Sequence, residues 1–80
     1  MTKQIRELLA EHAGLSVDID TLSDDASLFE AGMTSHSTVN LMLALENSFD
    51  VEFPDSMLRR GVFESVSAIA AALTELRRAA

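Results

Sequence analysis

The 80-residue chain has no cysteine, and this absence limits the chemistry that its own side chains can perform. Thiol catalysis, disulfide bridges and cysteine-based zinc sites are excluded. A chain without cysteine fits a reducing compartment, so we expect a cytoplasmic protein. Because 48% of the residues are hydrophobic, residues 1–80 can form one small domain with a modest core and without a stabilising metal.

Long apolar runs are also missing. No stretch approaches the roughly 20 apolar residues that span a bilayer. The first six residues begin a helical pattern and do not resemble a secretory signal. We therefore expect no membrane partner.

Basic residues are absent from the middle of the chain. No Lys or Arg lies between Arg6 and Arg59, whereas eleven acidic residues lie in that stretch, and the net charge is −7. Nucleic-acid binding normally requires a basic surface, so we expect no nucleic-acid partner. The acidic middle favours a basic protein partner, although acidic surfaces also keep small proteins in solution.

The apolar spacing predicts an all-α bundle of three main helices and one short helix with a long first loop. The first helix is expected over residues 2–13, with Thr2 as its N-cap and Gly14 as its left-handed end. Its apolar face comprises Ile5, Leu8, Leu9 and His12. The loop over residues 15–34 needs apolar anchors, which we identify as Leu15, Val17, Ile19, Leu22, Leu28, Phe29 and Met33, and a helical turn is expected near Ser27–Glu30.

The second helix is predicted over residues 35–49, with its core stripe formed by Leu41, Met42, Leu45 and Phe49. Asp55 is expected to cap the short third helix, which Gly61 ends. Ser65 begins the last helix, whose buried stripe is Val66, Ile69, Ala70, Leu73 and Leu76. The only strand candidate, residues 51–53, is too short.

The join between the long loop and the second helix is the part of the chain best suited to chemistry. Ser35 follows the turn Gly32-Met33-Thr34, where a hydroxyl is exposed and helix amides are unpaired. Such a position can hold a phosphate. We expect no enzyme, because a hydrolase needs a base and an orienting group near its serine. We also expect no metal site, because the acids of the first loop lack the Ca²⁺-loop spacing.

The second helix carries more apolar surface than a core stripe needs. A second stripe, at spacings of three, four and seven, begins one residue after Ser35 and comprises His36, Val39, Asn40 and Leu43. Val39 and Leu43 are expected to be exposed beside Glu46 and an acidic rim. An apolar strip with acidic edges favours a docking surface, although a small bundle can also bury such a helix on nearly every side.

Taken together, the segments Gly32-Met33-Thr34-Ser35-His36, Val39-Asn40-Leu41-Met42-Leu43-Ala44-Leu45-Glu46 and Phe49-Asp50-Val51-Glu52-Phe53-Pro54-Asp55 resemble an acyl carrier protein over about residues 28–55. The resemblance implies that Ser35 receives 4′-phosphopantetheine from coenzyme A, by the action of a phosphopantetheinyl transferase. The thiol of that arm would then hold an acyl group as a thioester. Two positions depart from the family pattern: Thr34 replaces an Asp, and His36 replaces a Leu. Thr34 can still cap the helix, whereas we interpret His36 first as a solvated surface residue and next as a recognition contact.

The Thr34-Ser35 pair, the Leu-Met-Leu-Ala-Leu-Glu run and Leu58-Arg59-Arg60 are most similar to the stand-alone aminoacyl carrier proteins. That resemblance implies a monomer that an amino acid:carrier protein ligase loads with glycine or alanine and that a downstream acceptor enzyme unloads. The implied partner-binding residues are Thr34, His36, Val39, Asn40 and Leu43. Two alternatives stay open: a carrier for fatty acid, polyketide or peptide synthesis, and an unmodified helical interaction module.

Overall fold

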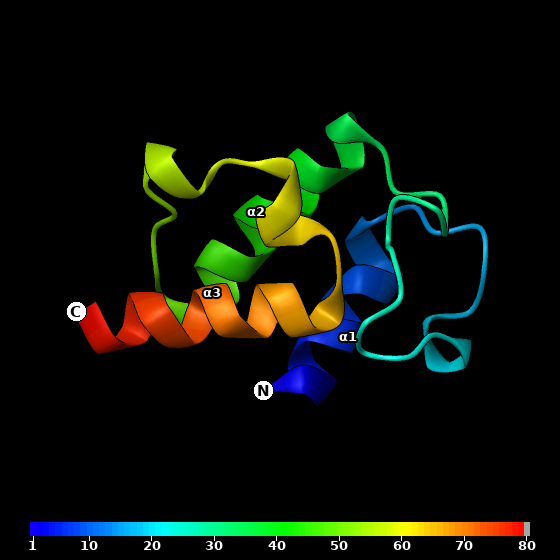
Figure 1. The fold of residues 1–80 in the computed structure, drawn as a ribbon, viewed down its shortest axis with the longest axis horizontal. Helices are drawn as coiled ribbons and strands as arrows, with labels where there is room; N and C mark the ends of the chain where they lie inside the picture. The colour runs from blue at the N-terminus through cyan, green and yellow to red at the C-terminus, as the bar shows by residue number, and fades with distance from the viewer. Residues whose placement is uncertain (80) are drawn as a thin grey trace.

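The computed structural model describes residues 1–79. This part of the chain contains three α-helices and three 3-10 turns, joined by loops (Figure 1). The helices are α1 (Thr2–His12), α2 (Ser35–Phe49) and α3 (Val66–Ala79), and the turns are η1 (Ile19–Thr21), η2 (Asp55–Met57) and η3 (Arg60–Phe63). The predicted all-α bundle and its three main helices are confirmed. The single short helix expected between α2 and α3 is replaced by the two turns η2 and η3.

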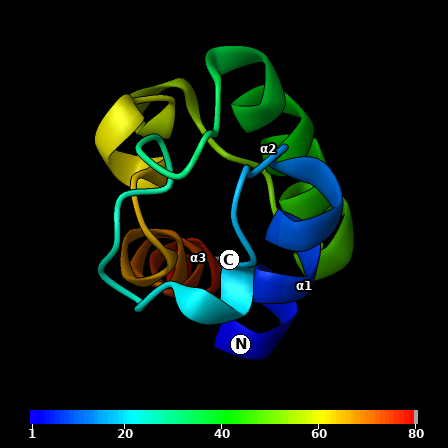
Figure 2. The same ribbon diagram turned by 90° about the vertical axis from the view of Figure 1, so that its right-hand side faces the viewer.

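The core lies where the three helices meet. α1 packs against both α2 and α3, and α3 also packs against η3, so the elements surround a common interior (Figure 2). The largest fully buried side chains come from all three helices and from the first loop: Ile5, Leu9, Leu28, Leu41, Leu45, Val66, Ile69 and Leu73. The predicted core stripes of the second and last helices are confirmed, with their remaining members partly buried: Met42, Phe49, Ala70 and Leu76.

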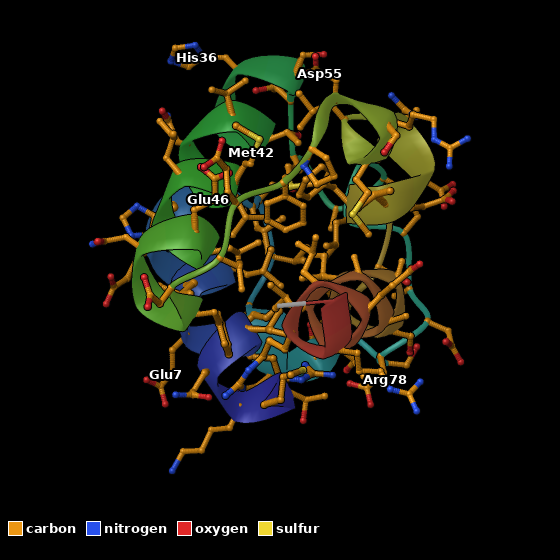
Figure 3. The ribbon with its side chains drawn as sticks, turned by 90° about the vertical axis from the view of Figure 1, so that its left-hand side faces the viewer. Glu7, His36, Met42, Glu46, Asp55 and Arg78 are labelled. Atoms are coloured by element: carbon orange, nitrogen blue, oxygen red, sulfur yellow. The ribbon has the colours of Figure 1, made fainter. Side chains whose placement is uncertain are left out.

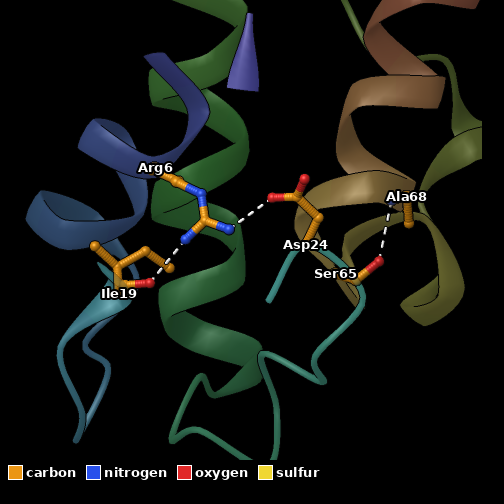
Figure 4. A network of polar contacts seen from close by, with 5 residues as sticks. All are labelled: Arg6, Ile19, Asp24, Ser65 and Ala68. Atoms are coloured by element: carbon orange, nitrogen blue, oxygen red, sulfur yellow. Dashed lines mark hydrogen bonds and ion pairs between the residues drawn. The ribbon is translucent and has the colours of Figure 1, made fainter. Parts of the chain in front are cut away.

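Polar contacts attach the first loop to α1 and α3, and those with Arg6 of α1 are drawn in Figure 4. The Arg6 guanidinium donates to the Ile19 carbonyl at 2.8 Å and pairs with the Asp24 carboxylate at 2.6 Å. The Ser67 amide of α3 donates to the Asp24 carbonyl at 2.9 Å. These bonds hold the first loop in one conformation, although it contains little regular secondary structure.

Most of the predicted loop anchors point inward. Ile19, Leu28 and Met33 are buried, and Leu15, Leu22 and Phe29 pack partly buried against the core. The prediction for Val17 is wrong, because its side chain is 46% exposed. The neighbouring Ser16 donates both its amide and its hydroxyl to the Ala31 carbonyl, which directs this stretch toward the loop rather than the core. The helical turn near Ser27–Glu30 is present as one bond from the Ala31 amide to the Ser27 carbonyl.

The ends of α1 differ in part from the prediction. Met1 is the N-cap, without a side-chain bond, and Thr2 already lies inside the helix. His12 is exposed, because Ala13 occupies the buried position that follows Ile5 and Leu9 at intervals of four. The predicted left-handed Gly14 is confirmed by its φ of +64°.

The connection from α2 to α3 also departs from the prediction at its caps. Pro54 is the N-cap of η2, and Asp55 is the first residue of the turn and makes no side-chain cap bond. Gly61 lies inside η3 instead of ending a helix. The predicted start of α3 is confirmed, because the Ser65 hydroxyl accepts from the Ala68 amide at 3.1 Å (Figure 4).

Two contacts hold this connection beside α2. The Glu46 carboxylate accepts from the Phe53 amide at 2.8 Å. The Phe53 ring in turn packs on Phe63 of η3, with the ring centroids 5.2 Å apart. The segment that carries η2 and η3 is thereby fixed near the first half of α2, where it forms one wall of a groove.

Candidate functional site

Thr34 and Ser37 cap the beginning of α2, and Ser35 and His36 lie between them in the sequence. The Thr34 hydroxyl accepts from the Ser37 amide at 3.1 Å, and the Ser37 hydroxyl accepts from the Thr34 amide at 2.8 Å. The predicted cap at Thr34 is confirmed, and its reciprocal partner Ser37 was not foreseen. Such a box satisfies two amides that a helix end otherwise leaves unpaired.

Ser35 is the first residue of α2, and its side chain is exposed. Among residues 1–79 its hydroxyl has no hydrogen-bond partner, because Thr34 and Ser37 already cap the helix. The first turn of α2 contains no acidic residue. An anion at this hydroxyl would therefore meet helix amides and the positive end of the helix dipole, without a neighbouring carboxylate on that turn.

Gly32 and Met33 determine where the chain enters α2. Gly32 has a φ of +115°, and a Cβ there would lie 2.9 Å from the Ser16 amide nitrogen. Met33 is only 4% exposed, and its amide donates to the Leu28 carbonyl at 3.0 Å. Position 32 therefore requires a glycine, because of both its backbone conformation and the close approach of Ser16. Met33, the residue directly before the N-cap Thr34, is anchored in the core.

A groove of about 420 Å³ opens beside the attachment candidate, and we call it the Ser35 groove. Its walls come from the first half of α2, from the first loop and from the segment after η2: Phe29, Ser35, Thr38, Val39, Met42, Leu58, Arg59, Arg60 and Phe63. Most of these side chains are apolar. The Arg60 guanidinium lies over the Phe29 ring, 3.9 Å from its centroid, in a cation–π contact that closes one side.

The second stripe of α2 is exposed, as predicted. Val39 is 52% and Leu43 55% exposed, and His36 points away from the molecule at the beginning of the helix (Figure 3). The structure divides the stripe between two hollows. Val39 borders the Ser35 groove, whereas Asn40 and Leu43 border a shallow hollow against α1. The stripe is therefore a ridge between two concave surfaces.

The acidic rim beside this ridge is smaller than the sequence suggested. Glu46 is partly buried, because its carboxylate turns toward the Phe53 amide and accepts a hydrogen bond from it. The Glu46 carboxylate is therefore engaged in a hydrogen bond within the fold and contributes less to an acidic surface. Figure 3 shows Glu46 on α2, next to Met42 along the same helix.

Neither histidine lies in a catalytic arrangement in the structure. His36 is exposed on α2, and His12 lies on α1, 3.5 Å from the exposed carboxylate of its neighbour Glu11. Over residues 1–79, no group of three or more His, Cys, Asp or Glu side chains is arranged to hold a metal ion. No helix in the same stretch is long and apolar enough to cross a membrane.

The sequence matches the family of the phosphopantetheine attachment site over residues 3–73. It is 46% identical over 69 residues to the aminoacyl carrier protein of Agrobacterium fabrum strain C58, covering 86% of this chain and 83% of the relative. It is 38% identical over 63 residues to the D-alanyl carrier protein of Streptococcus sanguinis strain SK36, covering 78% of each.

The fold matches carrier proteins of known structure. One is the Agrobacterium tumefaciens carrier protein in complex with an engineered Bradyrhizobium japonicum glycine:[carrier protein] ligase and AMP. The TM-score is 0.90 at 43% identity, over 92% of this chain and 99% of that chain. Another comes from the B. japonicum ligase in complex with glycylated carrier protein, with a TM-score of 0.68 at 32% identity, over 89% and 90% of the chains. The chain therefore belongs to the carrier protein family defined by a phosphopantetheine attachment site, and it is a homologue of the aminoacyl carrier proteins.

Proposed function

We propose that Ser35 is the residue that carries 4′-phosphopantetheine. In the modification, the Ser35 oxygen forms a bond to the phosphorus of the pantetheine phosphate of coenzyme A. The pyrophosphate bond breaks, adenosine 3′,5′-bisphosphate leaves, and the hydroxyl proton passes to a base of the transferase. The observation that carries this proposal is the exposed Ser35 hydroxyl, which no other residue of 1–79 engages while Thr34 and Ser37 cap α2.

The residues around Ser35 fit a phosphodiester. No carboxylate lines the Ser35 groove, and none lies in the first turn of α2. Two arginines, Arg59 and Arg60, do line it, and the guanidinium of Arg60 lies over the Phe29 ring. In a protein with a net charge of −7, this is a favourable place for a phosphate.

We further propose that the bound arm supplies a thiol that holds glycine or alanine as a thioester. The support is the likeness to an aminoacyl carrier protein, to a D-alanyl carrier protein and to a carrier protein crystallised with a glycine ligase. A ligase that uses ATP would first join the amino acid carboxylate to the α-phosphorus of ATP, with release of pyrophosphate. The thiol would then displace AMP and lose its proton. The chain itself would contribute the attachment point and a docking surface, and no catalytic group.

The docking surface for the ligase is proposed to be the exposed ridge beside the arm. This surface adds Thr34 to the ridge of His36, Val39, Asn40 and Leu43, and all five residues are exposed. A ligase must reach the end of an arm rooted at Ser35, so contacts beside that root position the thiol best. Exposed Val39 and Leu43 supply the apolar centre that such contacts require.

Intact-mass measurement after co-expression with a phosphopantetheinyl transferase tests the attachment directly. The wild-type chain is expected to gain one phosphopantetheine, and Ser35→Ala to gain none. Ser48→Ala is the matched control, because Ser48 is an exposed serine of the same helix, and it is expected to be modified normally. A wild-type chain that stays unmodified would favour an interaction module, and an adduct on Ser35→Ala would place the arm elsewhere.

A further inference from the structure

The Ser35 groove contains the only basic residues in the long central part of the chain. Of the six Lys and Arg residues, Arg59 and Arg60 are the two that lie between Arg6 and Arg77, and both line this groove. No Asp or Glu lines it. In a chain with thirteen acidic residues, an apolar groove with only positive charges is a local exception.

The two guanidiniums are not neutralised by the fold. Among residues 1–79, neither Arg59 nor Arg60 forms an ion pair, in contrast to Arg6, which pairs with Asp24. Arg60 is held over the Phe29 ring at 3.9 Å, a contact that keeps its charge at the wall of the groove. Both side chains are exposed, so the groove carries two positive charges that no ion pair among residues 1–79 neutralises.

An arm rooted at Ser35 begins at the wall of this groove, because Ser35 is one of its lining residues. The groove offers apolar contacts from Phe29, Val39 and Met42, and the guanidiniums attract the phosphodiester at the root of the arm. An arm with a neutral end can lie along it. An ammonium at that end would lose hydration on burial. It would also meet the like charges of Arg59 and Arg60, which the single negative charge of the phosphodiester neutralises only in part.

We propose that Arg59 and Arg60 make the Ser35 groove selective for the charge at the end of the arm. This inference rests on the proposed function, in which the arm is attached to Ser35 and carries an amino acid. With a neutral end, the arm rests in the groove. With the ammonium of an amino acid at its end, the arm stays outside, where an acceptor enzyme reaches it. Arg59 and Arg60 are thus specificity-determining residues that act by repelling the cargo of their own carrier.

The test compares three end groups of nearly the same shape and different charge. A phosphopantetheinyl transferase attaches arms from coenzyme A analogues in which an amide replaces the labile thioester. The arms end in a glycyl, a glycolyl or a propionyl group, which differ in a terminal ammonium, hydroxyl or methyl. The chemical shifts of Phe29, Val39, Met42 and Phe63 report occupancy of the groove, since all four line it. No ligase is needed, and intact mass shows whether each arm is attached.

In the wild-type protein, the glycolyl and propionyl arms are expected to shift these signals severalfold more than the glycyl arm does. Arg59→Gln combined with Arg60→Gln is expected to narrow the difference between the glycyl and glycolyl arms, leaving the part that comes from the lost hydration of the ammonium. Arg77→Gln combined with Arg78→Gln is the charge-matched control at the exposed end of α3 and is expected to keep the difference.

The outcomes separate this inference from the proposed function. If no arm is attached to Ser35, the proposed function itself fails. If the arms are attached but glycyl and glycolyl arms shift the groove signals equally in the wild-type protein, the charge selection is wrong and the proposed function stands. That comparison needs no substitution, so it remains decisive even if the double variant of Arg59 and Arg60 does not fold.

Discussion

Thr34 and Ser37 cap α2 reciprocally, each side chain accepting a hydrogen bond from the other residue's amide, at 3.1 and 2.8 Å. Ser35 lies between them with an exposed hydroxyl. The residues that cap this helix are therefore distinct from Ser35, for which we propose the chemical role. A helix capped by Ser35 itself would occupy the oxygen that a phosphate must reach.

This division predicts unequal effects of two neighbouring substitutions. Thr34→Ala removes an N-cap and should lower the free energy of unfolding by about 0.5–2 kcal/mol. Ser35→Ala removes a side chain without a hydrogen bond and should change it by no more than about 0.5 kcal/mol. Urea unfolding followed by circular dichroism measures both. Equal destabilisation by the two variants would mean that Ser35 takes part in capping.

The glycines offer a second matched pair. Gly32→Ala forces a Cβ to within 2.9 Å of the Ser16 amide nitrogen at a φ of +115°, so it should destabilise by more than about 1 kcal/mol. Gly61→Ala places a Cβ where no atom lies within 4 Å, at a residue without a positive φ, and should be neutral or slightly stabilising. Thermal unfolding of the two variants checks the geometry of the loop that leads to Ser35. A Gly32→Ala protein as stable as Gly61→Ala would contradict that geometry.

Two leucines of α2 separate the core from the ridge. Leu45 is fully buried and Leu43 is 55% exposed, although they lie two residues apart. Leu45→Ala should cost about 2–5 kcal/mol, as expected for a buried leucine. Leu43→Ala should cost about 0.5 kcal/mol or less. The free energies of unfolding in urea give the comparison, and a large loss on Leu43→Ala would show that the ridge is part of the core.

The ridge should matter for loading instead. Leu43→Asp is expected to leave the fold intact and to raise the KM of an amino acid:carrier protein ligase for the phosphopantetheinylated protein by at least about tenfold, as for the loss of an apolar contact at an interface centre. Gln4→Glu, which adds the same charge on an exposed position of α1, serves as control and should load normally. Equal loading of the two variants would place the ligase on another face.

The helix positions could be predicted because apolar spacing is a local property of the sequence. The stripes through Leu41 and Leu45 and through Ile69 and Leu73 are confirmed for this reason. The cap at Thr34 could be predicted too, since a short polar side chain precedes the apolar run. Its partner Ser37 was missed, because a capping box is normally recognised by a Glu or Gln at that position.

Among the missed features, the exposure of Val17 and the Ser35 groove depend on contacts between residues distant in the sequence, whereas the cap expected at Asp55 is displaced by its neighbour Pro54. Asp55 has the side chain of a cap, but Pro54 occupies the capping position and the segment forms a three-residue turn. Val17 has an apolar side chain, but the bonds of Ser16 to Ala31 leave it exposed. The Ser35 groove was also invisible in the sequence, because Arg60 meets Phe29 only after the chain has folded around α2.

The most direct test of the account is the loading of the phosphopantetheinylated protein in parallel reactions. One reaction contains an amino acid:carrier protein ligase, ATP and glycine or alanine, and the other contains a fatty acyl ligase, ATP and a long-chain fatty acid. Intact mass before and after hydroxylamine identifies a thioester. The account predicts a hydroxylamine-sensitive aminoacyl adduct that is absent from Ser35→Ala. Efficient fatty acylation without any aminoacylation would contradict the aminoacyl function and leave a carrier of another cargo.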